Sequence, residues 1–305
     1  MRVRKTGAGD GPAERRPVSG WPLPGNHGPF PKPDKDSILV CPVGGAGRIG
    51  MNWTLYGHDG RWLLVDAGST FAPRDVEGVE AIFPDVGSIR SILPHLDGLV
   101  VTHAHEDHIG AIHRLWPGIS CPIYATPFAS ALIRNRLAEA GTIGRVKMRS
   151  FTPNQTFTVG PFSIRSVRMT HSVPECVALA LRTPSGTVFH TGDWKFDDNP
   201  VVGHLPDYRA LRQVGVEGVL AMVCDSTNAN RDAGSLRTNE AQVQQGFVKA
   251  FRRVPGMVVV ACFSSNVARV ASASIAAAET GRRLAIAGRS LVNSEKAARE
   301  CGLLN

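Results

Sequence analysis

The chain has 305 residues, of which 43% are hydrophobic and 20% charged, and this balance is typical of a folded protein with a sizeable core. The formal net charge of +8 is compatible with a polyanionic partner but does not require one. No apolar run approaches the roughly 20 residues that a membrane-spanning helix needs, and the basic N-terminus lacks the apolar segment of a secretory signal.

Six cysteines are scattered along the chain without a C-x-x-C pair. They are Cys41, Cys121, Cys176, Cys224, Cys262 and Cys301. This spacing argues against a zinc cluster built from cysteines and favours reduced thiols over a disulfide framework. We therefore expect a cytoplasmic protein that has no membrane partner.

The first 37 residues are expected to form a disordered, basic extension, because Pro, Gly and scattered charges dominate there with little periodicity. From residue 38, short apolar runs alternate with turns and predict the strands of a buried sheet. These runs are ILVCPV, NWTLYG, WLLVDAG and LDGLVVTH.

The stretch VTHAHEDHIGAIH, residues 101–113, follows the last of these runs and holds His103, His105, Asp107 and His108 within six positions. Buried without partners, each would carry a desolvation penalty, so packing explains them poorly. Imidazole nitrogens and carboxylate oxygens are ligands of metals such as zinc, and a loop between a strand end and a helix can hold them rigidly. We expect the first two histidines to reach one ion, and Asp107 and His108 to reach a second.

The remaining elements fall into two series. Residues up to about 235 predict helices at 109–116 and 127–141 and strands at 121–126, 155–171 and 218–225. Residues 176–193 predict a hairpin with its turn at 184–186. From about residue 238 the pattern becomes a helix–strand alternation typical of a parallel, doubly wound sheet. Its predicted helices are 239–254, 266–281 and 290–302, and its predicted strands are 256–263 and 282–288.

The motif HAHEDHIGA resembles the signature of the metallo-β-lactamase fold. More narrowly, several stretches resemble, in order, the ribonuclease J family, which belongs to the β-CASP branch of that fold. They are VGGAGRIGMNWTLYG, LLVDAGSTF, VTHAHEDHIGAIHRLWP, CPIYATPF, MTHSVPECVALALRTPSGTVFHTGDWKFD, CDSTNANR, CFSSNVARV and AGRSLVNS. The resemblance covers residue 37 to the end of the chain. It implies an α/β protein in which residues 38–235 form the N-terminal portion of a metallo-β-lactamase αββα sandwich and residues 236–305 a partial β-CASP domain.

The resemblance also implies roles for single residues. The first metal would be held by His103, His105 and His171, the second by Asp107 and His108, and Asp193 would bridge both. Asp107, His108 and Asp193 would act in catalysis. Outside this motif context, His171 would be interpreted as an ordinary histidine and Asp193 as a turn residue. Asp66 would support a ligand rather than bind metal itself.

A substrate groove is implied beside the motif CDSTN. Asp225 matches the first β-CASP sequence element, and it is followed by Ser226, Thr227 and Asn228. The chain departs from the family pattern at Arg48, where the family commonly has an acidic residue.

The implied activity is that of a metal-dependent ribonuclease, an endonuclease and 5'-3' exonuclease of RNA processing and decay. Hydroxide shared by two divalent ions, Zn²⁺ or alternatively Mn²⁺ or Mg²⁺, would hydrolyse the phosphodiester. RNA is then the implied partner, and self-association would use a C-terminal region absent here. The resemblance further implies an N-terminal fragment, since no histidine follows His204. We expect little nuclease activity from such a fragment alone.

Three alternatives stay open. The first is another hydrolase of the same fold, such as a lactonase or thioesterase acting on a small molecule. The second is a DNA-processing β-CASP nuclease, and the third is a non-catalytic, metal-dependent RNA-binding or assembly subunit. The motif at 225–231 and the helix–strand series after residue 238 favour a nuclease over the small-molecule hydrolase.

Overall fold

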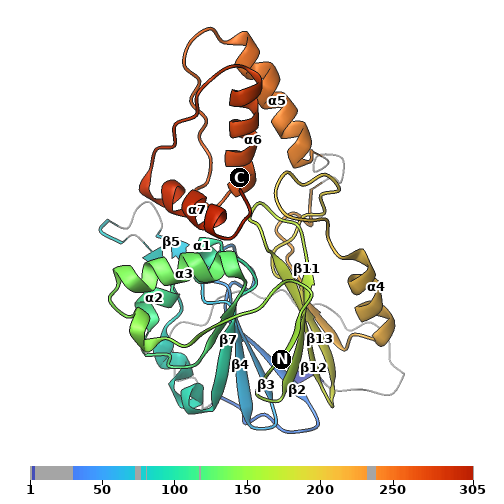
Figure 1. Ribbon diagram of the computed structural model, residues 1–305. Helices are drawn as coiled ribbons and strands as arrows, with labels where there is room; N and C mark the ends of the chain where they lie inside the picture. Colours follow the sequence, from blue (N-terminus) through green and yellow to red (C-terminus); the bar gives the residue numbers. More distant parts are fainter. Residues whose placement is uncertain are drawn as a thin grey trace.

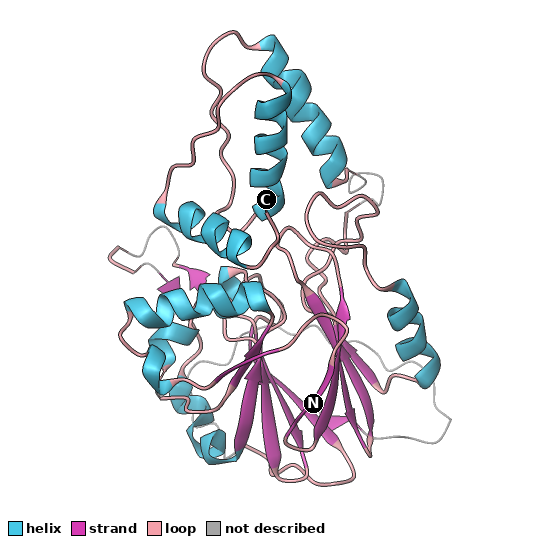
Figure 2. Cartoon of the chain, in the orientation of Figure 1, coloured by secondary structure: helices cyan, strands magenta, loops and turns pink. Residues whose placement is uncertain are grey.

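The computed structural model describes residues 2–3, 30–72, 77–79, 81–116, 118–231 and 238–304. Two β-sheets lie face to face with helices on their outer sides, and three further helices stand above them (Figures 1 and 2). Within the described residues, no helix is long and apolar enough to cross a membrane.

The first sheet has seven strands in the order β1-β2-β3-β4-β7-β8-β9. Pairing is antiparallel from β1 to β4 and parallel from β4 to β9. The strands are β1 (Arg2–Val3), β2 (Ile38–Gly44), β3 (Trp53–His58), β4 (Arg61–Val65), β7 (Leu96–Val100), β8 (Ile123–Ala125) and β9 (Met148–Ser150). A separate small ladder joins β5 (Thr70–Phe71) to β6 (Ala81–Ile82).

The second sheet has five strands in the order β10-β11-β12-β13-β14, antiparallel except for the last, parallel pair. The strands are β10 (Thr156–Val159), β11 (Phe162–Arg168), β12 (Val177–Thr183), β13 (Gly186–His190) and β14 (Ala221–Val223). The predicted long strand at 155–171 is therefore a hairpin that turns at Gly160, whose φ is +53°.

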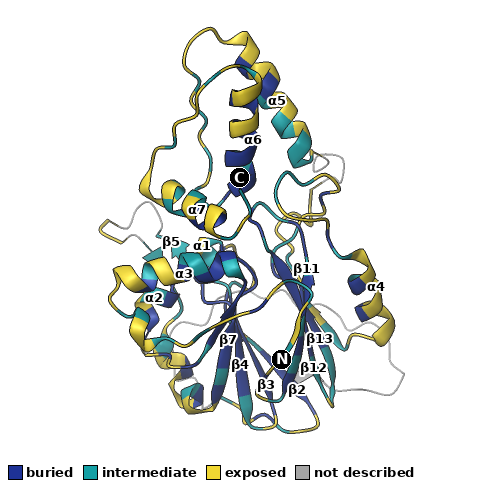
Figure 3. Cartoon of the chain, in the orientation of Figure 1, coloured by how far each residue is buried: buried dark blue, intermediate teal, exposed yellow. Residues whose placement is uncertain are grey.

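Alternation along the strands creates the layers, because successive side chains of a strand point to opposite faces. Leu63 and Val65 of β4 face the second sheet and pack with Leu179 and Leu181 of β12. Leu64, on the other face of β4, belongs to the core under the helices. Figure 3 shows both sheets buried between helices that are exposed on their outer sides. The predicted αββα sandwich is confirmed.

The helices that cover the first sheet are η1 (Val86–His95), α1 (Glu106–Ile109), α2 (Ile112–Leu115) and α3 (Pro127–Glu139), and η2 (Ile143–Arg145) follows α3. The second sheet is covered by α4 (Tyr208–Glu217), whose Ala210 and Val214 face the strands. The predicted helix at 109–116 is in fact two short helices, α1 and α2, and the first of them begins within the histidine motif.

The chain from residue 238 contains α5 (Glu240–Arg253), α6 (Val267–Glu279) and α7 (Arg289–Glu300), close to the predicted helical ranges. The strands predicted at 256–263 and 282–288 do not form a ladder with any described residue. Val258 and Val260 pack on α5 and α6, whereas Met257 and Val259 are exposed. The first run thus has the alternation of a strand without a neighbouring strand.

Two other expectations concern the ends of the predicted units. Within the predicted extension, Phe30 makes an edge contact with Trp62, and His58 Nδ1 lies 2.9 Å from the Ser37 carbonyl oxygen. Residues 4–29 of that extension lie outside the described residues. The predicted domain boundary between 235 and 236 does so as well.

The chain after β4 passes very close to the histidine loop. A Cβ atom on Gly68 would lie 1.6 Å from the carbonyl oxygen of Asp107. Such a contact would force backbone to move, and overpacking of this kind typically costs about 1–3 kcal/mol.

We therefore expect Gly68→Ala to lower the free energy of unfolding by about 2 kcal/mol in urea denaturation. Gly215→Ala in α4 is the matched control, because nothing lies within 4 Å of a Cβ there. It should stabilise the chain by about 0.5–1 kcal/mol, since Gly is unfavourable inside a helix. Equal stability of Gly68→Ala and the parent chain would contradict the close approach.

Candidate metal centre

The loop from β7 into α1 is fixed by backbone hydrogen bonds from the segment after β4. Ala67 N donates to His108 O at 2.8 Å, and Ser69 N donates to Glu106 O at 3.2 Å. On the other side, Asn52 N donates to the Asp107 carbonyl oxygen at 2.9 Å. These bonds fix the loop at the carboxyl ends of β4 and β7. Binding sites of α/β proteins commonly lie at this end of the strands.

Three imidazoles meet at this edge. His103 Nε2 lies 3.1 Å from His105 Nδ1, and His171 Nε2 lies 3.2 Å from the same atom. His171 comes from the segment between β11 and β12, so both sheets contribute. One carboxylate oxygen of Asp193, in the loop after β13, completes a group whose ligand atoms all lie within 4.8 Å of one another.

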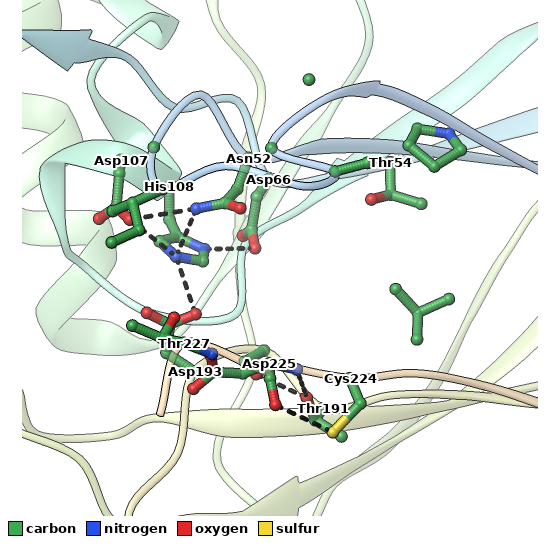
Figure 4. A pocket seen from close by; sticks show the side chains of 18 of the residues that line it. Asn52, Thr54, Asp66, Asp107, His108, Thr191, Asp193, Cys224, Asp225 and Thr227 are labelled. Atoms are coloured by element: carbon green, nitrogen blue, oxygen red, sulfur yellow. Dashed lines mark hydrogen bonds and ion pairs between the residues drawn. The ribbon is translucent and has the colours of Figure 1, made fainter. Parts of the chain in front are cut away.

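A second group consists of Asp107, His108 and Asp193 and meets the same distance limit. His108 Nε2 lies 3.3 Å from Asp193 Oδ1 and 3.6 Å from Asp107 Oδ2 (Figure 4). The other oxygen of Asp193 lies 3.9 Å from His171 Nε2. A single carboxylate therefore faces both groups, one oxygen toward each.

Asp66, buried behind the loop, orients two of these histidines. Its Oδ1 accepts from Thr102 N at 2.8 Å, and its Oδ2 lies 2.8 Å from Thr102 Oγ1 and 2.7 Å from His108 Nδ1. The Thr102 hydroxyl, which donates to Asp66, can accept from His103 Nδ1 at 3.0 Å. With both Nδ1 atoms protonated, the Nε2 lone pairs of His103 and His108 are directed into the site.

The first group is electrically suited to a cation. Burial, together with the neighbouring histidines, lowers the pKa of His103 well below its usual value and that of His105 to about 3. Burial also lowers the pKa of His171. At neutral pH these imidazoles are uncharged, so three lone-pair nitrogens can face a common point. The Ser172 hydroxyl, 3.1 Å from His105 Nε2, can fix the tautomer that leaves Nδ1 free.

The second group has a different electrostatic character. Burial opposes charge on His108, but Asp66, Asp193 and Asp107 surround its ring and raise the pKa of His108 well above its usual value. Burial opposes charge on Asp193 too, yet contact with His108 lowers the pKa of that carboxyl to about 2. A proton on His108 therefore occupies the position where a cation would satisfy the same carboxylates.

These donors fit a metal ion. The imidazole nitrogens of His103 and His171 both lie within 3.2 Å of His105 Nδ1, and the Asp193 carboxylate stands beside them. Such a nitrogen and oxygen set matches borderline divalent metals. The described residues thus contain a His/Asp cluster suited to binding metal.

A pocket of about 490 Å³ opens beside the second group. Asn52, Asp107 and His108 lie on one side of it, and Asp193 and Thr227 lie on the other (Figure 4).

Among the residues expected near a substrate groove, Asp225, Ser226 and Thr227 line this pocket, whereas Asn228 is not one of the described residues that do so. Asp225 Oδ1 accepts from Thr227 N at 2.8 Å, which holds the segment in a turn.

The sequence motifs did not indicate three contributors to this site: Asn52, Thr102 and Ser172. Asn52 Nδ2 donates to Asp107 Oδ2 at 3.1 Å and lies 3.0 Å from His108 Nε2. All three are common polar residues next to recognisable motifs. Their adjacency to the glycine-rich turn, to His103 and to His171 is the only signal that the sequence offers.

Comparison with known proteins assigns a family. Residues 61–247 match the beta-lactamase superfamily domain, and residues 255–305 match the ribonuclease J beta-CASP domain. A ribonuclease J from Sinorhizobium meliloti is 41% identical over 88% of this chain and 48% of its own length. One from Mycolicibacterium smegmatis is 39% identical over 88% of this chain and 47% of its own length.

A solved structure is also similar in fold. It is that of a protein of unknown function from Enterococcus faecalis V583, with a TM-score of 0.54 and 17% identity, covering 77% of this chain and 62% of that one. The chain spans about half the length of the curated relatives it matches. The resemblance to ribonuclease J seen in the sequence is confirmed by these matches. The chain therefore belongs to the beta-lactamase superfamily, in which its curated relatives include ribonucleases J.

Proposed function

We propose that this chain carries the dimetal centre of a metal-dependent ribonuclease. His103, His105 and His171 hold one ion, Asp107 and His108 hold the second, and Asp193 bridges the two. The observation that carries the proposal is the convergence of these six side chains, which come from three separate segments, into two adjoining groups. A nitrogen-rich set of this kind favours Zn²⁺, with Mn²⁺ or Mg²⁺ as alternatives.

Two divalent ions supply an activated water at neutral pH and stabilise negative charge on phosphoryl oxygens. The chain's own residues place these functions. Asp193 directs one oxygen to each group, and Asp66 keeps the lone pairs of His103 and His108 pointing inward. The pocket beside the second group gives a phosphodiester access to that side.

RNA is the proposed substrate, cut internally and from its 5' end. The names of the relatives, the match to the ribonuclease J beta-CASP domain and the net charge of +8 support this choice. A cytoplasmic location is proposed as well, since all six cysteines are free thiols.

Cleavage assays distinguish this proposal from the alternatives. The chain should be tested alone and joined to the part of the Sinorhizobium meliloti relative that it does not match, with that relative as positive control. Single-stranded 5'-monophosphorylated RNA, matched DNA, nitrocefin and a thioester are the substrates. We expect metal-dependent cleavage of RNA, by at least the joined form, that is lost in Asp193→Ala.

Preferred cleavage of DNA, or hydrolysis of a small substrate without RNA cleavage, would replace the proposed substrate. If neither form hydrolyses any substrate although both bind metal, the nuclease assignment is wrong and a binding role remains.

Metal content tests the bridging carboxylate separately. We expect Asp193→Ala to reduce the zinc retained per chain after dialysis at both groups, because each loses a ligand. Asp198→Asn is the control, since Asp198 lies outside both groups and accepts a hydrogen bond from Tyr208 that an amide oxygen can also accept. Unchanged zinc content in Asp193→Ala, measured by atomic emission, would exclude a shared ligand.

Asp66→Asn tests the orientation of the histidines. Asn tolerates the positive φ of +60° at this position, so the backbone can stay as it is. The amide cannot accept from Thr102 N, Thr102 Oγ1 and His108 Nδ1 together, and the tautomer of His108 is no longer fixed. We expect zinc affinity to fall about 10–100-fold in competition with a chromogenic chelator. An affinity within twofold of the parent chain would show that Asp66 has no such role.

A further inference from the structure

Among the described residues, the pocket beside the second group is lined by four carboxylates and one strongly basic side chain. Asp66, Asp107, Asp193 and Asp225 provide the carboxylates. Among the described residues that line the pocket, Arg48 is the only Lys or Arg. The whole chain has a net charge of +8, but the side chains that line this pocket are predominantly acidic. The position of Arg48 is accordingly important for any anion that enters.

Arg48 lies in a turn whose backbone is fixed. Arg48 N donates to Gly45 O at 3.2 Å, and the glycines at 45, 47 and 50 all have φ values of +75° to +90°. A Cβ on Gly45 would lie 2.5 Å from Asn52 Oδ1, so the turn packs directly on Asn52. The positive φ and the close approach together favour glycine at position 45.

The turn is connected to the candidate metal centre through Asn52. The backbone N of Asn52 donates to Asp107 O at 2.9 Å, and its side chain donates to Asp107 Oδ2 at 3.1 Å. Arg48 therefore lies four residues before Asn52, whose side chain contacts Asp107 of the second group. Arg48 is exposed and lines the same pocket as Asn52.

We propose that Arg48 binds a phosphate of the RNA next to the phosphate held at the second metal group, and so positions the strand for cleavage. This inference rests on the proposed function.

Two divalent ions would balance the four carboxylates. The guanidinium of Arg48 then supplies the attraction for a second phosphate, because its planar fork matches the geometry of phosphate oxygens. A pocket of about 490 Å³ is larger than one phosphate group needs and has room for a neighbouring nucleotide.

The test is a binding titration that does not depend on turnover. The zinc-loaded chain is titrated into a fluorescein-labelled, single-stranded 2'-O-methyl oligouridylate, and anisotropy is followed at several salt concentrations. We expect Arg48→Ala to weaken binding about tenfold and to reduce the slope of log affinity against log salt by about 0.7, the loss of one contact to a single strand. Arg48→Lys should restore the slope but only part of the affinity, because Lys lacks the fork.

Arg212→Ala is the matched control, since Arg212 is exposed on α4 and outside the pocket. A series of oligonucleotides, each with one neutral methylphosphonate linkage, identifies the contacted phosphate. At one position, the neutral linkage should weaken binding by the parent chain but not by Arg48→Ala. Thermal melts of all variants distinguish a lost phosphate contact from a loss of folding.

The outcomes separate the two proposals. Binding by the parent chain with the same affinity and slope in Arg48→Ala, or an equal loss in Arg212→Ala, overturns the role of Arg48 and leaves the proposed function standing. No binding of the oligonucleotide by the zinc-loaded parent chain overturns both. A loss that is confined to Arg48→Ala and to one linkage supports the inference.

Discussion

The carboxylate of Asp66 is the constraint on which the rest of the site depends. It is almost fully buried, it sits at the end of β4 with φ of +60°, and it is surrounded by Thr102 and His108. A non-glycine residue in the left-handed region is uncommon, and it persists where the surroundings impose it. Here three hydrogen bonds to one carboxylate offset both that conformation and the cost of burial. Asp66 thereby fixes the directions of His103 and His108.

Both sheets contribute residues to the candidate metal centre. The first sheet supplies the histidine loop, locked by Gly68 and Asn52, while the second supplies His171 and Asp193 at its facing edge. Among the residues that the structure describes, Asp193 is the only side chain that belongs to both groups. The relative position of the sheets, set by the apolar core between them, therefore determines whether one carboxylate can reach both groups. The packing of the core between the sheets thus determines where Asp193 lies relative to the histidine loop.

The sequence predicts the parts of the site that are local. His103, His105, Asp107 and His108 lie within six positions, so their spacing alone indicates a common site. His171 and Asp193 come from another sheet, and only a resemblance to a family associates them with the loop. The positions of Asn52 and Arg48 are set by a glycine-rich turn, and hydrophobic periodicity does not predict the path of such a turn. The run 256–263 shows what a hydrophobic pattern cannot predict. Alternation indicates which face is buried, but a strand also needs a neighbouring strand for its backbone hydrogen bonds.

X-ray absorption at the zinc edge, on the chain titrated with Zn²⁺, tests the central claim most directly. The account predicts nitrogen and oxygen ligands at about 2.0–2.2 Å. It also predicts a second metal at about 3.5–4 Å, since one carboxylate faces both groups. Sulfur scattering at about 2.3 Å, or ligands without any metal neighbour at full occupancy, would contradict a pair of ions joined by Asp193.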